Sequence, residues 1–304
     1  MTSKQIFARL HGIMPPLVTP FNKRGDVDEG AYRANLERYT GIGLAGVVVA
    51  GTTGEAPFLT PEERLRLTEI ARSAVKPGEL VVTGTGLEST RGTINLSREA
   101  VARGADVALL LTPGYYRAKM DAPALLGHFR AVADSVRRPV LLYSIPQCAG
   151  TKMPVDVIAA LARHGNIAGL KESSGDLEYV RAILQRVPRD FRVFCGNVPI
   201  LLDALRAGGA GGIMGQACFA PELCVAFYEA WKVGNEDRAI ELFARLVPLA
   251  AEVNMRYGAP AVKAAMDVAG YRGGDPRSPL LPVTAAARRS IARTLKASGA
   301  SLNF

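Results

Sequence analysis

The chain has 304 residues, of which 48% are hydrophobic and 21% charged, the composition of an ordinary globular protein. Its formal net charge is +9, but no RNA-binding aromatic motif or groove-reading helix accompanies the basic residues, so a nucleic-acid partner is not expected. No apolar run could span a bilayer and the first residues do not resemble a secretory signal, so we expect a cytoplasmic protein without a membrane partner.

Short aliphatic runs alternate with longer segments of helical period through most of the chain. The runs predict strands at 16–19, 46–50, 80–83, 107–111, 140–143, 167–170, 191–195 and 210–214. The segments between them predict helices that include 29–39, 61–75, 90–103 and 154–163. At 60–63, a threonine cap, a proline and two glutamates mark the start of a helix. This alternation predicts a parallel sheet.

Eight strand–helix units within about 230 residues predict a closed (β/α)8 TIM barrel of the α/β class. An open doubly wound sheet is the alternative, but it usually carries a Gly-x-Gly-x-x-Gly turn after its first strand, and none occurs there. From residue 234 the pattern predicts helices, at 236–253, 259–268 and 283–297. We therefore expect a barrel with the active site at 1–233 and a C-terminal helical extension at 234–304 that packs on it.

The four cysteines, at 148, 195, 218 and 224, form no Cys-x-x-Cys pair and have no histidine at ligand spacing. The three histidines lie in unrelated segments. We therefore expect neither a structural zinc site nor a disulfide framework, and free thiols suit a reducing compartment.

Lys171 follows the apolar run 167–170 and precedes a polar segment. Catalytic groups of a barrel gather at the C-terminal ends of its strands, so this position predicts an amine at the mouth. An apolar wall there penalises the ammonium form and leaves a neutral, nucleophilic amine, which a Schiff-base lysine needs. Read alone, the position favours a lysine whose amine simply reaches water.

Other polar groups are predicted at the same mouth. Tyr143 ends the fifth strand, next to the strand of Lys171, and the pair Tyr115-Tyr116 follows the fourth strand. The segment Gly51-Thr52-Thr53-Gly54-Glu55 follows the second strand, and its backbone N–H groups and two hydroxyls suit a small carboxylate. Taken singly, this segment is equally well explained as a turn whose threonines cap the next helix. Taken singly, Tyr143 is explained as a packing residue.

Three segments together resemble the dihydrodipicolinate synthase / N-acetylneuraminate lyase family of class I aldolases. They are Gly51-Thr52-Thr53-Gly54-Glu55, Tyr143-Ser144-Ile145-Pro146 and Gly169-Leu170-Lys171-Glu172-Ser173, and the resemblance covers nearly the whole chain. The resemblance implies that Lys171 forms an imine with pyruvate or another 2-oxo acid, while Tyr143 shuttles the proton. It implies no metal and no organic cofactor.

The resemblance also implies roles for further residues. Thr52 and Thr53 hold the carboxylate of the substrate and complete the proton relay. Tyr115, with Tyr116 as the alternative, reaches from one subunit into the site of its neighbour. A homo-oligomer, either a dimer or a homotetramer, is therefore expected.

One position separates the members of this family by substrate. Members that use aspartate semialdehyde place an arginine two residues after Pro146, where this chain has Cys148. A neutral thiol cannot replace a bidentate guanidinium. Several segments, among them 55–60, 87–90 and 171–176, resemble instead 4-hydroxy-2-oxoglutarate aldolase.

In that subfamily, the residues that match Ser173 and Gly196 line the substrate site, and Ile213 is assigned to the same substrate-binding set. Thr53 differs from the asparagine of the vertebrate-type enzyme, although a threonine pair is common in the family. We therefore expect a lyase that cleaves 4-hydroxy-2-oxoglutarate to pyruvate and glyoxylate.

Other functions of the same fold stay open. They are 4-hydroxy-tetrahydrodipicolinate synthase, which condenses pyruvate with aspartate semialdehyde, and another 2-keto-3-deoxy sugar acid aldolase or dehydratase. A non-enzymatic sensor would be expected to lack Lys171 or Tyr143, and both are present.

Overall fold

The computed structural model describes residues 1–300 and confirms the predicted (β/α)8 barrel of the α/β class. Its parallel strands follow the order β1-β8-β7-β6-β5-β4-β3-β2. They are β1 (Gly12–Met14), β2 (Gly46–Val49), β3 (Leu80–Gly84), β4 (Val107–Leu111), β5 (Val140–Ser144), β6 (Ile167–Glu172), β7 (Arg192–Cys195) and β8 (Gly211–Ile213). No helix in the described residues is both long and apolar enough to cross a membrane.

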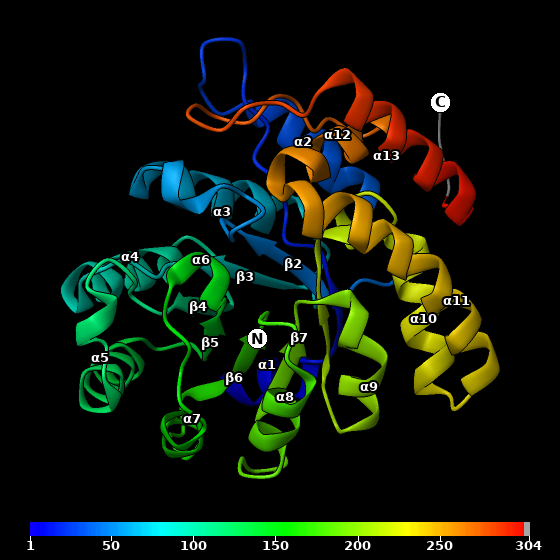
Figure 1. Ribbon diagram of the computed structural model, residues 1–304. Helices are drawn as coiled ribbons and strands as arrows, with labels where there is room; N and C mark the ends of the chain where they lie inside the picture. Colours follow the sequence, from blue (N-terminus) through cyan, green and yellow to red (C-terminus); the bar gives the residue numbers. More distant parts are fainter. Residues whose placement is uncertain (301–304) are drawn as a thin grey trace. The chain divides into compact units, whose positions relative to one another are not determined.

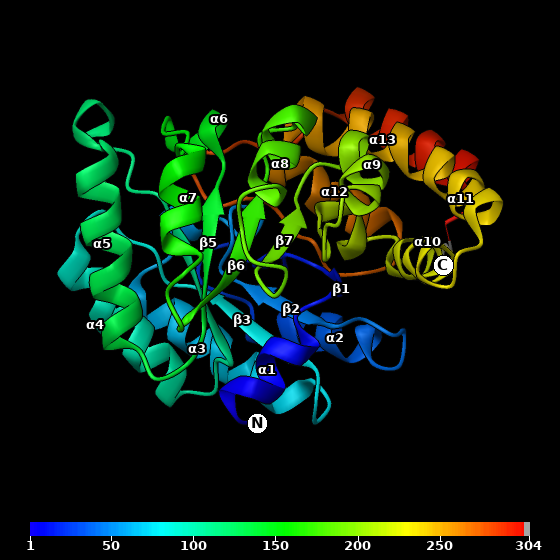
Figure 2. The same cartoon turned by 90° about the horizontal axis from the view of Figure 1, so that it is seen from below.

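The chain divides into two compact units. The first comprises Met1–His11 and Leu80–Gly212. Its helices are α1 (Ser3–Arg9), α4 (Thr90–Ala102), α5 (Ala122–Ser135), α6 (Pro146–Ala149), α7 (Val155–Leu161), α8 (Leu177–Leu184) and α9 (Leu201–Arg206). Figure 2 shows α4, α5 and α7 on one side of the strand β5. The aliphatic runs of β3, β4 and β5 are buried almost throughout, as is typical of parallel strands covered by helices.

The second unit comprises Gly12–Glu79 and the described part of the chain from Ile213. Its helices are α2 (Glu29–Tyr39), α3 (Pro61–Ala74), α10 (Pro221–Lys232), α11 (Glu236–Leu249), α12 (Ala259–Val268) and α13 (Ala285–Ser298). Figure 1 shows α11 between α10 and α13, which both pack against it. The described part of the chain from residue 234 thus consists mainly of helices, as predicted, while the proposed division at residue 234 stays a prediction.

The start of α3 matches its sequence signature. The Thr60 hydroxyl accepts a hydrogen bond from the Glu63 N–H at 3.2 Å, and the Glu63 carboxylate accepts one from the Thr60 N–H at 2.8 Å. Pro61 occupies the first turn, where its missing N–H has no partner to lose. This capping box sets the direction of the chain that follows the segment 51–55.

The predicted position of the first strand is wrong. It was predicted at 16–19, but β1 is Gly12–Met14, and Pro16 forms only an isolated bridge with Val48. Pro15 and Pro16 have no N–H to donate to a strand ladder, so a regular strand cannot continue through them. The buried residues Leu17 and Val18, which suggested a strand, belong to an irregular segment.

The helix predicted at 236–253 is also shorter than expected. The α-helical part ends at Leu249, and a π-helix, Ala250–Met255, follows it. Pro248 lies inside α11, where it removes one backbone donor and crowds the preceding turn. The π-helix begins two residues after this proline, and such segments are rare and occur mostly next to or within α-helices.

Candidate active site

Lys171 and Tyr143 lie side by side in the first unit. Both are buried, with 4% and 3% of their surface exposed. They are register partners on the neighbouring strands β6 and β5, and the Lys171 Nζ lies 4.3 Å from the centroid of the Tyr143 ring. The sequence predicted these two residues as neighbours, and the structure confirms it. It also extends β6 one residue past Lys171, to Glu172.

Glu172 turns the other way from Lys171, because successive side chains of a strand point to opposite faces. It is fully buried, and its Oε1 accepts a hydrogen bond from the Ser174 N–H at 2.8 Å. Burial raises the pKa of the Glu172 carboxyl, an effect that the bond from Ser174 only partly opposes. Burial therefore favours the protonated form of Glu172 more than water would.

Ser173 and Gly196, both predicted to bind substrate, are in close contact. A Cβ placed on Gly196 would lie 1.9 Å from the Ser173 hydroxyl oxygen, so only glycine leaves room for that hydroxyl. The Ser173 carbonyl accepts a hydrogen bond from the Gln147 side chain at 2.6 Å. The Gly196 N–H donates to the Glu172 carbonyl at 2.7 Å, which fixes the ends of β6 and β7 to one another.

Cys148 lies on α6, one residue after the Gln147 that contacts Ser173. It is an exposed free thiol. Partial burial raises its pKa, and the positive charge of Lys171 acts in the opposite direction. The thiol is therefore neutral near pH 7.

Tyr115 and Tyr116 protrude from the first unit, with 79% and 70% of their surface exposed. Their rings meet edge to face with centroids 5.0 Å apart. The Glu88 carboxylate accepts hydrogen bonds from the N–H groups of Gly114 and Tyr115 at 3.1 and 3.0 Å. Glu88 therefore fixes the start of the loop that carries both tyrosines.

Thr52, Thr53 and Ile213 belong to the second unit. The two threonines are half-buried in the turn after β2, and Ile213 is the buried last residue of β8. The turn is closed by hydrogen bonds from the Glu55 N–H to the Thr52 carbonyl and from the Ala56 N–H to the Gly51 carbonyl, at 3.1 and 3.2 Å.

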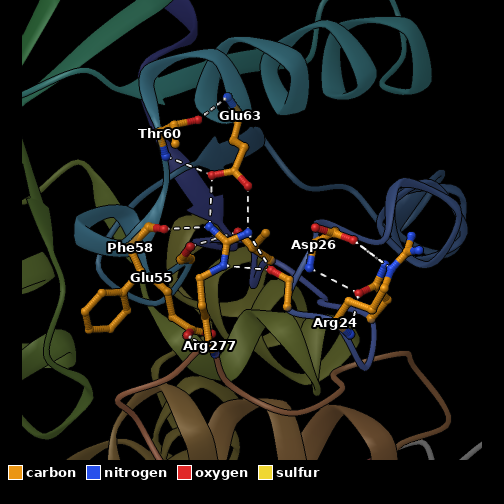
Figure 3. Close-up of polar contacts among 11 residues, drawn as sticks. Arg24, Asp26, Glu55, Phe58, Thr60, Glu63 and Arg277 are labelled. Atoms are coloured by element: carbon orange, nitrogen blue, oxygen red, sulfur yellow. Dashed lines mark hydrogen bonds and ion pairs between the residues drawn. The ribbon is translucent and has the colours of Figure 1, made fainter.

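A group of charged residues around this turn was missed by the sequence analysis. Arg277 donates to both oxygens of Glu63, at 2.9 and 2.6 Å, and to the carbonyls of Phe58 and Gly25 (Figure 3). The hydrogen bond with Arg277 lowers the pKa of Glu63. Lys263 on α12 forms a buried ion pair with Glu55. The one available signal was a lysine within the otherwise apolar run 261–266.

Comparison with known proteins shows the family to which this chain belongs. Residues 9–298 match the dihydrodipicolinate synthetase family. A relative from Methanopyrus kandleri, named 4-hydroxy-tetrahydrodipicolinate synthase, is 36% identical over 293 residues, covering 96% of this chain and 97% of the relative.

Solved structures agree with that match. The chloride-inhibited dihydrodipicolinate synthase of Acinetobacter baumannii, complexed with pyruvate, superposes with a TM-score of 0.91 at 28% identity, covering 96% of this chain and 99% of that one. A monomeric dihydrodipicolinate synthase variant superposes with a TM-score of 0.90 at 27% identity, covering 97% and 98%. This chain therefore belongs to the dihydrodipicolinate synthetase family of Schiff-base carbon–carbon lyases.

Proposed function

We propose that Lys171 is the residue that forms the imine and that Tyr143 moves the proton. The observation that supports this assignment is the buried Lys171 amine, 4.3 Å from the centroid of the Tyr143 ring. The amine attacks the keto carbon of a 2-oxo acid, and water leaves to give an iminium ion. The iminium accepts the electron pair of the neighbouring C–C bond when that bond breaks, and Tyr143 transfers the proton that the departing oxygen releases.

Thr52 and Thr53 are proposed to bind the carboxylate of the pyruvate half, and Thr52 to pass the proton onward from Tyr143. Their turn offers two hydroxyls and backbone N–H groups, the donors that a small carboxylate requires. Ser173, Gly196 and Ile213 are proposed to contact the rest of the substrate. The space that Gly196 leaves for the Ser173 hydroxyl supports a role for that hydroxyl.

The proposed reaction is the cleavage of 4-hydroxy-2-oxoglutarate to pyruvate and glyoxylate. Its main support is Cys148, a neutral thiol at the position where users of aspartate semialdehyde place an arginine. Loss of a charged hydrogen-bond partner commonly costs about 1.5–3 kcal/mol, or roughly tenfold to a hundredfold in discrimination. The shorter substrate would present its distal carboxylate to Ser173 instead.

The second candidate is 4-hydroxy-tetrahydrodipicolinate synthase, which the names of the relatives favour. The two candidates are separated by measuring kcat/KM for both reactions on one enzyme preparation. We expect faster release of pyruvate from 4-hydroxy-2-oxoglutarate than condensation of pyruvate with aspartate semialdehyde. Efficient formation of the condensation product would reverse this order and identify the synthase.

We further propose a cytoplasmic homo-oligomer, a dimer or tetramer, in which Tyr115 enters the site of a neighbouring subunit. The exposed aromatic pair at 115–116, held by the Glu88 carboxylate, is the surface that supports this arrangement. Sedimentation of the active protein tests it, and a fully active monomer would contradict it.

A further inference from the structure

Two oppositely charged side chains are completely buried in the second unit. The Lys263 Nζ lies 2.5 Å from the Glu55 Oε1, and neither side chain is exposed. Lys263 also donates to the Asp275 carbonyl at 2.9 Å and lies 4.3 Å from the centroid of the Phe21 ring. A buried ion pair commonly adds little net stability, because desolvation offsets the attraction between the charges. Its presence here therefore calls for a structural purpose.

Glu55 itself has an unusual backbone conformation. Its φ and ψ are 58° and 37°, in the left-handed region, and Ala50 has a φ of 51°. Residues with side chains rarely adopt this region, and they keep it only where several surrounding contacts enforce it. These two residues bracket the four-residue segment that contains Thr52 and Thr53.

The contacts that enforce this conformation come from both sides of the turn. On one side, the Thr19 hydroxyl donates to the Gly54 carbonyl at 2.8 Å, and a Cβ on Gly54 would lie 2.7 Å from the Leu17 carbonyl oxygen. On the other side, Glu55 Oε1 meets Lys263, while Oε2 accepts a hydrogen bond from the Arg277 backbone N–H at 2.8 Å. Both oxygens of the buried carboxylate are thus engaged.

The partners of Glu55 are themselves fixed. The Arg277 side chain is held by Glu63 and by the Phe58 carbonyl, as Figure 3 shows, and it also donates to the Gly25 carbonyl. Its guanidinium carbon lies 4.3 Å from the centroid of the Phe21 ring, which also contacts Lys263. Glu55 is therefore bound to a rigid set of groups, and its backbone cannot relax without breaking the buried ion pair.

We propose that Lys263 is a positioning residue, which acts through its ion pair with Glu55 to hold the turn 51–55 in the conformation that binds the substrate carboxylate. This role rests on the proposed function for the part that concerns Thr52 and Thr53. The restraint on the turn itself follows from the contacts within the second unit. Lys263 and Glu55 then affect pyruvate binding without touching the pyruvate.

The native protein provides the first test. The N–H groups of Glu55 and Ala56 close the turn, so their hydrogen exchange should be as slow as that of the β2 backbone. Exchange as fast as at the exposed turn 22–25 would overturn the proposal, whatever the enzyme does with pyruvate. This measurement needs no variant and remains decisive if a substituted chain does not fold.

The second test uses Lys263→Met and the double variant Glu55→Gln with Lys263→Met. The single variant leaves a buried carboxylate unpaired and is expected to lose stability, whereas the double variant replaces the pair by neutral groups and should fold. The readout is the pyruvate concentration that gives half-maximal borohydride labelling of Lys171. We expect that concentration to rise about tenfold in the folded variants, together with faster exchange in the turn.

The matched control is Lys232→Met, which breaks an exposed pair with Glu229 at 3.4 Å and should change neither readout. If the native protein is not labelled at all, the proposed function is wrong. Hydrogen exchange alone then tests whether the turn 51–55 is restrained. If the native protein is labelled and the folded double variant has an unchanged pyruvate requirement and unchanged exchange, the role of Lys263 is refuted.

Discussion

Two lysines in residues 1–300, Lys171 and Lys263, are buried in different surroundings. Lys263 in the second unit meets the Glu55 carboxylate at 2.5 Å, whereas Lys171 in the first unit meets the face of the Tyr143 ring. Burial lowers the pKa of Lys263 and the Glu55 carboxylate opposes that effect, while the Asp275 carbonyl also holds the amine. The face of the Tyr143 ring leaves the Lys171 amine in reach of a third group. Burial alone therefore does not make a lysine nucleophilic. The group that the amine contacts decides whether the lysine has a structural or a covalent role.

The strongest test of this difference is covalent labelling. Borohydride reduction with pyruvate should add one reduced adduct to the peptide that contains Lys171 and none to the peptide that contains Lys263. Lys171→Ala should abolish labelling and turnover, because no other amine is assigned the same role. Mass spectrometry of the digested protein checks both peptides. An adduct that persists in Lys171→Ala would assign the chemistry to another residue.

A smaller loss is expected from Tyr143→Phe. The substitution keeps the ring beside Lys171 and removes only the hydroxyl, so the protein should fold and the imine should still form. Turnover should fall by about a hundredfold to ten-thousandfold, the usual contribution of a general acid–base group. Steady-state kinetics measures it, with Tyr257→Phe as the same substitution outside the proposed site. Nearly native turnover would mean that a group other than Tyr143 transfers the proton.

Glu55 and Glu88 each hold a turn of the chain, and the two carboxylates differ in exposure. Glu55 is buried, whereas Glu88, which binds the N–H groups of Gly114 and Tyr115, is exposed to solvent. Exposed hydrogen bonds contribute roughly 0.5–1.5 kcal/mol, so Glu88→Ala should lower kcat/KM about two- to tenfold. Glu178→Ala is the control, since it removes an exposed carboxylate that pairs only with its helix neighbour Arg181. A loss as large as that of Tyr143→Phe would instead place Glu88 in the chemistry.

The smallest effect should come from Glu172→Gln and should depend on pH. Burial raises the pKa of this carboxyl in the folded protein above its ordinary value of 4.5. The folded chain then keeps a proton that the unfolded chain releases, so this contribution is complete below pH 4.5 and is lost as pH rises through the folded pKa. The variant, which cannot ionise, should gain stability relative to the native protein as pH increases.

Urea unfolding at several pH values measures that difference. Glu178→Gln, on an exposed surface, serves as the control and should show no such trend. A constant difference between Glu172→Gln and the native protein across the range would mean that the carboxyl is not held protonated.

The sequence was sufficient for the features that depend on local pattern and strand order. Tyr143 and Lys171 could be paired because each closes an aliphatic run, and consecutive strands of a barrel are neighbours. The cap at Thr60 could be read from four residues. The substrate preference inferred from Cys148 stays a prediction, because it concerns the substrate that binds and not the fold of the chain.

Other features depend on contacts between distant residues or on local exceptions. The pairing of Glu55 with Lys263 has no counterpart in any local pattern, since nothing in either segment identifies the other. The prediction of a strand at 16–19 is wrong because the hydrophobic run includes Pro16 and directly follows Pro15, and neither proline can donate to a strand ladder. Pro248 likewise ended an α-helix that its periodicity extended too far.

The hydrogen bond between Glu55 and Arg277 spans 222 residues of chain, which has a consequence for biosynthesis. A ribosome that adds about 5–20 residues per second needs roughly 10 to 45 seconds to make the segment between them. During that time the strained turn lacks the groups that enforce it, so a nascent chain that already contains Lys171 still has a relaxed 51–55 segment. Competence to bind the carboxylate would then arise late, when the last helices emerge and dock. Premature termination before Arg277 would yield chains that carry the reactive lysine without an ordered substrate receptor.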